Sequence, residues 1–236
     1  PELGELTEDR PKAMLDIKGK PLLGRQVEAL NGAGVKDISV VVGWKKEAVD
    51  LPNLKVFDAT GSGGELASLM KADAVLDGPA LVLYGDILFD TTLIQRLLTT
   101  EGDAVLVVDR SPTEGRTKRD LVQTNNAVDT DGRFLNGRRL DTLARIGQDI
   151  TDSNGEWTGI MMLSARAAQA LRDLHQDLSH ADDGPVHQAT TLSEAALTDI
   201  LQLLADQGMT INTIDTYKGW MEIDTFEDYR RAWAQV

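Results

Sequence analysis

The stretch Ala80-Leu81-Val82-Leu83-Tyr84-Gly85-Asp86 decides the fold, because it is an almost wholly apolar run that ends in a glycine and a carboxylate. Residues 38–42 (ISVVV), which end at Gly43, and Ala104–Asp109 have the same character. Short apolar runs of this kind are typical of strands that are buried on both faces, as in a parallel sheet. We therefore expect Asp86 to emerge at the carboxyl end of a buried strand, the edge at which open α/β sheets bind ligands.

Helical patterns lie between these runs. Residues 22–33 (LLGRQVEALNGA) end at Gly34, residues 65–75 (ELASLMKADAV) end near Gly78, and residues 92–98 precede the third run. Strands that alternate with helices of this length predict βαβ units. The sequence thus predicts an α/β, Rossmann-like, doubly wound fold with a mixed, mainly parallel sheet.

The second half of the chain begins with a polar region, residues 111–154, in which Asp131-Gly132 is typical of a hairpin turn. We expect a small antiparallel subregion there. The later elements are expected to be a strand at 159–163, a helix at 164–174, a polar loop at 175–186, a helix at about 192–207, strands at 210–216 and 220–223, and a last helix from about Thr225.

Composition excludes several classes of function. Asp and Glu number 38 against 24 Lys and Arg, and the resulting net charge of −14 argues against nucleic acid or an anionic membrane surface as a partner. The absence of cysteine excludes disulfides, thiolate catalysis and cysteine-based zinc sites. The three histidines, His175, His180 and His187, have no metal-ligand spacing. With no apolar run long enough to cross a bilayer, a cytoplasmic protein is the simplest interpretation.

Acidic side chains also gather near the end of the chain. In the segment Trp220-Met221-Glu222-Ile223-Asp224, period-two alternation places Glu222 and Asp224 on one face, where they would suit a hard cation. They could equally form the acidic start of the last helix, and Asp86 could be a turn cap. Lys12, after Pro11, could direct its ammonium group at a phosphate or be a solvated loop lysine.

Together these motifs resemble the sugar-nucleotidyltransferase-like superfamily over nearly the whole chain. The resemblance is to phosphonate cytidylyltransferases above all, including domains fused to phosphoenolpyruvate phosphomutase in fosfomycin biosynthesis. It is carried by residues 3–14 (LGELTEDRPKAM), 60–61 (TG) with 65–69 (ELASL), 84–89 (YGDILF), 119–122 (RDLV), 147–150 (GQDI), 155–159 (GEWTG) and 220–225 (WMEIDT).

The resemblance implies an enzyme that transfers CMP from CTP to a small phosphonate and releases pyrophosphate. It implies Mg²⁺ held by Asp86 and Asp224, with Lys12 stabilising the α-phosphate charge and Glu222 as an indirect support. 2-Hydroxyethylphosphonate is the favoured acceptor and 2-aminoethylphosphonate the next. Nucleotide contacts are implied for Leu3, Gly4, Lys12, Glu65, Ser68, Gly85 and Asp86, and acceptor contacts in the antiparallel subregion for Arg119, Lys118, Glu156 and Trp157.

We expect residues 1–236 to form a single nucleotidyltransferase domain. The first strand and most of the Gly-rich loop of the family are missing from this sequence, so we expect it to be part of a longer chain. Glu2 also stands where many relatives have an arginine, and another cation would have to replace that triphosphate contact. A fused phosphoenolpyruvate phosphomutase domain and a homodimer are both compatible with the resemblance.

Other functions stay open at this point. A hexose-1-phosphate nucleotidyltransferase would need more material than the short region between Val108 and Gly159, and a choline-phosphate cytidylyltransferase would need more aromatic residues than Trp157 and Trp220. A non-catalytic nucleotide-sensing domain could also retain this fold. The joint presence of the candidate lysine and the two candidate metal-binding aspartates argues against it.

Overall fold

The computed structural model describes residues 3–111, 119–125, 140–181 and 184–236. The expected hairpin turn at Asp131-Gly132 lies outside these residues. The α-helices are α1 (Leu22–Gly32), α2 (Glu65–Leu69), α3 (Thr91–Leu98), α4 (Ala165–His180), α5 (Leu197–Asp206) and α6 (Phe226–Gln235). The 3-10 helices are η1 (Gly4–Thr7), η2 (Lys12–Met14), η3 (Lys46–Ala48), η4 (Met70–Val75) and η5 (Leu192–Glu194). The strands are β1 (Asp16–Ile17), β2 (Lys20–Pro21), β3 (Ser39–Val42), β4 (Lys55–Asp58), β5 (Ala80–Leu83), β6 (Ile87–Phe89), β7 (Ala104–Asp109), β8 (Leu121–Thr124), β9 (Asp141–Gly147), β10 (Gly155–Leu163), β11 (Ile211–Thr216) and β12 (Trp220–Glu222).

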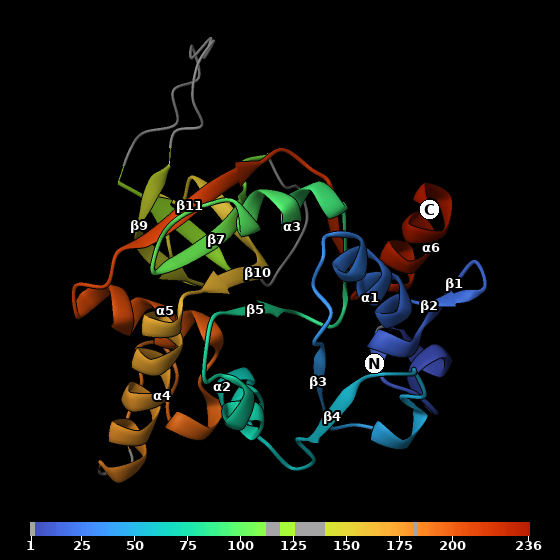
Figure 1. Cartoon of the computed structure of the whole chain (residues 1–236), viewed down its shortest axis with the longest axis horizontal. Helices are drawn as coiled ribbons and strands as arrows, with labels where there is room; N and C mark the ends of the chain where they lie inside the picture. Colours follow the sequence, from blue (N-terminus) through green and yellow to red (C-terminus); the bar gives the residue numbers. More distant parts are fainter. Residues whose placement is uncertain (1–2, 112–118, 126–139, 182–183) are drawn as a thin grey trace, which may run out of the picture.

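Strand β7 forms the centre of the core, as its apolar sequence predicts. Because side chains alternate along a strand, Ala104, Leu106 and Val108 pack with α4 and α5 on one face of the sheet. Val105 and Val107 pack with α3 on the other face. Figure 1 shows α3 on one side of this sheet and α2, α4 and α5 on the other. The α/β architecture with helices on both faces is therefore confirmed.

The sheet itself differs from the expected one. Its six strands run in the order β5-β10-β7-β11-β9-β8. Within this six-stranded sheet, the pair formed by β7 and β11 is the only parallel one among the described strands. Strand β10 is antiparallel to both β5 and β7, and β9 is antiparallel to β8 and β11. A further parallel pair, β3 with β4, forms a separate small sheet. The expectation of a mainly parallel sheet was wrong, because β10 runs antiparallel to both of the strands between which it lies and β9 runs antiparallel to both of its neighbours.

Two expected helices have other bounds. The pattern at 65–75 forms α2 followed by the 3-10 helix η4, with a non-helical residue at Ala72. Helix α4 extends to His180, through residues expected to form a loop, because its apolar stripe continues past Leu174 to Leu178, which packs against the core. His175 and His180 thus lie on a helix.

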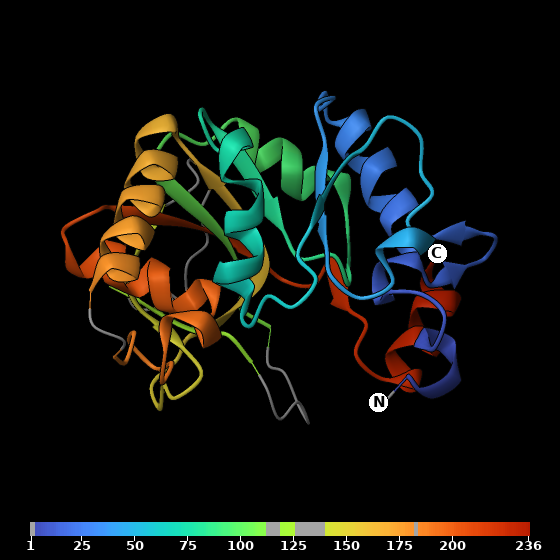
Figure 2. The same cartoon turned by 90° about the horizontal axis from the view of Figure 1, so that it is seen from below.

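The two ends of the described chain pack together. Leu3, Leu15 and Ile17 share one buried cluster with Ile223 and Ala232, so the N-terminal segment lies against β12 and α6. Figure 2 shows both ends on the same side of the molecule. Helix α6 starts at a capping box in which Thr225 and Asp228 each accept from the other's backbone N–H group. Among the described residues, no helix has the length and apolarity needed to cross a membrane.

Gly159 lies within β10 at an irregularity in its pairing with β7, and the ring of Tyr84 lies against it. The pairing of β10 with β7 shifts in register between Trp157 and Met161, and Gly159 has a φ of +74°. A Cβ atom at this position would stand 2.2 Å from Cδ2 of Tyr84. The backbone conformation and the close ring both require glycine here.

We expect Gly159→Ala to lower the free energy of unfolding by about 2–4 kcal/mol, since left-handed strain and a steric clash add together. Gly208→Ala is the matched control, because Gly208 has a φ of +89° and no atom within 4 Å of its Cβ position. That variant should lose only about 1 kcal/mol. Urea denaturation measures both, and equal losses would contradict the proposed contact with Tyr84.

Candidate active site

Three expected site residues from distant parts of the sequence meet at one point. Lys12 at the start of η2 donates a hydrogen bond to Asp224, and its Nζ atom lies 3.5 Å from Oδ2 of Asp86. Asp86 lies between β5 and β6, and Asp224 follows β12. The antiparallel pair β6–β12 continues into a bond in which the Ile223 N–H group donates to the Asp86 carbonyl at 2.9 Å. Strand pairing therefore brings the two aspartates together.

Glu222 belongs to the same group. Asp86, Glu222 and Asp224 each offer a carboxylate oxygen, and these atoms lie within 4.8 Å of one another. Mg²⁺ prefers oxygen ligands and needs only one or two carboxylates when phosphate and water complete its shell. The residues present thus fit this ion. Glu222, expected only as an indirect support, lies close enough to be a ligand.

This group carries an excess of negative charge, because one ammonium group faces three carboxylates. Burial raises the pKa of Asp86, the nearby charge of Asp224 raises it further, and Lys12 acts in the opposite direction. For Lys12 burial alone would lower the pKa, but the bond to Asp224 and the charge of Asp86 outweigh it, and the pKa is raised. Lys12 therefore stays charged, and a further cation would relieve the repulsion among the carboxylates.

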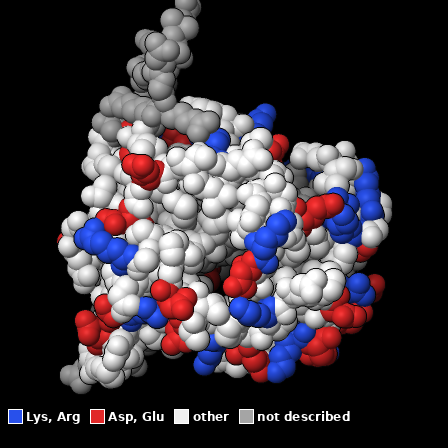
Figure 3. Space-filling view, in the orientation of Figure 1, with Lys and Arg blue, Asp and Glu red and all other residues white. Residues whose placement is uncertain are grey.

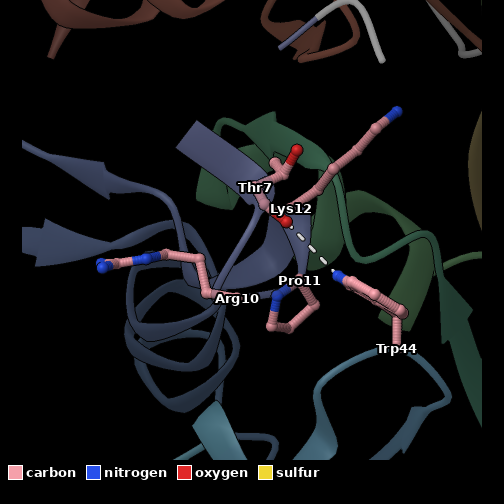
Figure 4. A pocket seen from close by; sticks show the side chains of 5 residues that line it. All are labelled: Thr7, Arg10, Pro11, Lys12 and Trp44. Atoms are coloured by element: carbon pink, nitrogen blue, oxygen red, sulfur yellow. Dashed lines mark hydrogen bonds between the residues drawn. The ribbon is translucent and has the colours of Figure 1, made fainter. Parts of the chain in front are cut away.

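A surface hollow of about 390 Å³ adjoins Lys12, which lines it together with Thr7, Arg10, Pro11 and Trp44 (Figure 4). The indole N–H of Trp44 donates to the Thr7 carbonyl at 3.3 Å. This bond joins the segment after β3 to the N-terminal loop that carries Lys12. The hollow has the size of a small-ligand pocket and lies beside the only lysine that contacts Asp86 or Asp224 within the described ranges.

A second polar group forms around Tyr84 at the end of β5. Its hydroxyl donates to Glu65 at 2.6 Å and lies 3.3 Å from Oδ2 of Asp120. Glu65 also accepts from the Leu197 N–H group at the start of α5. Burial and the charges of Glu65 and Glu156 raise the pKa of Asp120 to about 7, against the hydrogen bond from Tyr84.

Arg119 and Glu156 extend this second group. Both Nε and Nη2 of Arg119 lie 3.0 Å from Oε2 of Glu156, a buried residue of β10. Trp157 is only 2% exposed, donates its indole N–H to the Ile160 carbonyl, and packs its ring 5.3 Å from that of Tyr84. The structure thus places Trp157 in the core behind Tyr84. Lys118 lies outside the described residues.

The remaining expected nucleotide contacts lie apart from one another. Leu3 is buried in the N-terminal cluster, and Gly4 begins η1 with a φ of +51°. Gly85 is exposed, with its Cβ position 3.7 Å from Ala13, next to Lys12. Ser68 donates its hydroxyl to the Gly64 carbonyl within the first turn of α2. Glu65 contacts the Tyr84 group, beside the expected acceptor residues Arg119, Glu156 and Trp157.

The family model of MobA-like NTP transferase domains matches residues 6–214, a range that includes Lys12, Asp86 and Glu156. The chain belongs to this family. Membership in this family supports nucleotidyl transfer as the class of chemistry. Acidic and basic side chains are interspersed over the face shown in Figure 3, so any bound phosphate must be held by local groups.

Several named proteins that this chain resembles are distant from it in sequence. The CTP:phosphoglutamine cytidylyltransferase of Campylobacter jejuni is 21% identical over 94% of this chain and 91% of its own length. The CMP-5'-(3-aminopropyl)phosphonate synthase of Streptomyces rubellomurinus is 29% identical over 55% of this chain and 21% of its own length. Among solved structures, the inositol-1-phosphate CTP transferase of T. maritima has a TM-score of 0.68 at 19% identity, covering 98% of this chain and 89% of that chain. That likeness shows the shared fold.

Sequence reasoning did not name Tyr84 or Asp120 as site residues. Both stand beside residues that it did name, Tyr84 before Gly85-Asp86 and Asp120 after Arg119. The signal that could have found them is their position at strand ends, where polar side chains reach the ligand edge of the sheet. Their contact with Glu65 depends on the pairing of β5 with β10, which the sequence pattern does not show.

The raised pKa of Asp120 predicts a pH-dependent stability. Its pKa is about 7 in the folded state, against an ordinary value of 3.8 for an aspartate, so the carboxyl stays protonated up to about pH 7. Between these values the folded protein binds more protons, so the stability from this group is fully present at low pH and is lost as pH rises to about 7.

In Asp120→Asn the side chain is neutral at every pH. Its free energy of unfolding relative to the parent should therefore rise by about 1–3 kcal/mol between about pH 5 and about pH 7.5. Asp152→Asn, which changes an exposed aspartate of the same region, is the control and should show no such trend. A relative stability that stayed flat with pH would show that Asp120 is ionised throughout.

Proposed function

We propose that this chain is a Mg²⁺-dependent cytidylyltransferase that joins CMP from CTP to a small phosphonate and releases pyrophosphate. The observation that supports it best is the contact of Lys12 with both Asp86 and Asp224, beside Glu222. An ammonium group among carboxylates at a strand edge is suited to a metal-bound polyphosphate. The ammonium group and the metal ion would together neutralise the negative charge of the phosphates.

In this proposal the chemistry is one displacement at phosphorus. An oxygen of the phosphonate forms a bond to the α-phosphorus of CTP, and the bond from that phosphorus to the pyrophosphate oxygen breaks. The acceptor oxygen is already anionic, so no general base is needed, and catalysis consists of positioning and charge neutralisation. Asp86, Asp224 and Glu222 would hold Mg²⁺, which neutralises phosphate charge when bound. Lys12 would stabilise the charge that develops on the α-phosphate.

The choice of CTP rests on relatives. The phosphoglutamine, aminopropylphosphonate and inositol phosphate enzymes are all named for cytidylyl transfer. Their acceptors share a phosphate or phosphonate group on a small molecule. We assign that anionic group to Arg119, whose planar guanidinium can bind two oxygens at once, while Glu156 fixes its orientation.

The distal part of the acceptor then faces the second polar group. Burial raises the pKa of Asp120, and the negative charges of Glu65 and Glu156, which repel its ionised form, raise it further. An ammonium group would relieve this repulsion, whereas a hydroxyl would not. The geometry thus supports 2-aminoethylphosphonate as the acceptor. The sequence resemblance, by contrast, favours 2-hydroxyethylphosphonate. The fused phosphomutase domain, the homodimer and the single-domain boundary stay predictions.

Pyrophosphate release with a panel of substrates tests the function. With Mg²⁺ we expect turnover with CTP and 2-aminoethylphosphonate, less with 2-hydroxyethylphosphonate, and little with phosphocholine or glucose 1-phosphate. UTP, dTTP, ATP and GTP should replace CTP poorly. Asp86→Asn and Asp224→Asn should each lower kcat by about a hundredfold or more while the fold is kept, because a metal ligand is lost. Equal use of UTP or dTTP with a sugar phosphate would move the chain to the sugar nucleotidyltransferases.

Arg119→Lys tests the acceptor site. A single ammonium group cannot reproduce two parallel N–H donors, so kcat/KM for the acceptor should fall by about thirty- to a thousandfold, or about 2–4 kcal/mol. The KM for CTP should stay nearly constant. Arg166→Lys is the matched control, because Arg166 also pairs with a carboxylate, that of Asp103, but is 70% exposed on α4. Unchanged acceptor kinetics in Arg119→Lys would remove Arg119 from the acceptor site.

A further inference from the structure

Gln26 is a buried polar residue on the apolar side of α1. It is 6% exposed and lies one turn from Leu22 and one turn from Leu30, both buried in the core. A leucine would be the ordinary choice at such a position of the helix. Burying an amide costs free energy unless its hydrogen-bonding groups are satisfied, so the partners of Gln26 show why it is there.

The partners of Gln26 are two backbone carbonyls that bracket Asp86. Its Nε2 atom lies 2.9 Å from the Tyr84 carbonyl oxygen and 2.7 Å from that of Ile87. These carbonyls stand immediately before and after Gly85-Asp86. One side-chain amide therefore spans the turn that carries the candidate metal ligand.

The turn is held from a second direction as well. The Asp86 carbonyl accepts from Ile223 N–H, which comes from the segment that ends in Asp224. Gly85 between the bracketed residues has an exposed backbone and no side chain to pack. With β12 on one side and Gln26 on the other, the backbone of Asp86 is fixed relative to Lys12, Glu222 and Asp224.

We propose that Gln26 is a positioning residue that sets the Tyr84–Ile87 turn so that the Asp86 carboxylate can share a divalent cation with Asp224. This inference rests on the metal site of the proposed function. Gln26 contacts neither the reacting groups nor the cation. It acts through the backbone, and its loss leaves two buried carbonyls without this donor.

The experiment measures binding of Mn²⁺ alone to the free chain by electron paramagnetic resonance, with urea denaturation of each variant. Gln26→Met keeps the length of the side chain and removes both donors. Gln202→Met is the matched control, because Gln202 is also 6% exposed and hydrogen-bonds to the Ile146 N–H group and to Asp206, away from Asp86. We expect both variants to lose stability, but only Gln26→Met to weaken Mn²⁺ binding, by about tenfold.

Gln26→Glu extends the test and replaces it if the methionine variant does not fold. Burial should keep this carboxyl protonated, and its one O–H group can restore one of the two bonds, giving an intermediate Mn²⁺ affinity. Suppose that the parent binds Mn²⁺ and that Gln26→Met binds it as tightly as Gln202→Met does. The positioning role is then overturned, and the proposed function stands. Gln26→Glu takes the place of Gln26→Met in this comparison if the methionine variant does not fold. If the parent itself does not bind Mn²⁺, and Asp86→Asn behaves identically, the metal site and this inference both fail.

Discussion

The short antiparallel contact between β6 and β12 determines where the charged groups of the site lie. It pairs Ile87 with Glu222 and continues to the bond between Ile223 and Asp86, so two carboxyl-bearing segments from distant parts of the sequence run side by side. Like charges at such a distance repel each other, and the repulsion is largest where burial removes water. At this edge of the fold the charge of Lys12 partly compensates the repulsion between the carboxylates. A site with this charge balance suits a ligand that brings its own cation, as a metal-bound nucleotide does.

The same segment of chain serves both halves of the site. Tyr84 points its hydroxyl at Glu65 and Asp120, and two residues later Asp86 meets Lys12. Strand β5 ends at Leu83, and Gly85 and Asp86 form a turn, so the strand alternation of side chains does not continue from Tyr84 to Asp86. The polar group around Tyr84 and the group formed by Lys12, Asp86 and Asp224 are therefore only one turn of the chain apart. A displacement across two bound substrates needs this proximity, because the reacting oxygen must lie in line with the leaving group.

The strands and the group of Lys12, Asp86, Glu222 and Asp224 could be predicted from the sequence for a physical reason. Buried strands such as β7 are apolar on both faces, and period-two alternation near the end of the chain already places Glu222 with Asp224. Both are local signals. The position of β10 between β5 and β7, by contrast, depends on which strands pair across the chain, and an apolar strand carries no mark of its direction. The contacts of Tyr84 follow from that pairing and were therefore not predictable.

Glycine at 159 shows how backbone and chemistry are joined in this molecule. Its left-handed conformation shifts the register of β10, and the space left by its missing side chain is filled by the Tyr84 ring. The ring then rests on Trp157, which is why that tryptophan is buried and not at the surface. The hydroxyl at the far end of the ring can hold Glu65 and Asp120 only from this position. The arrangement of Glu65 and Asp120 thus depends on a residue that has no side chain, because the Tyr84 ring occupies the space that a side chain at position 159 would need.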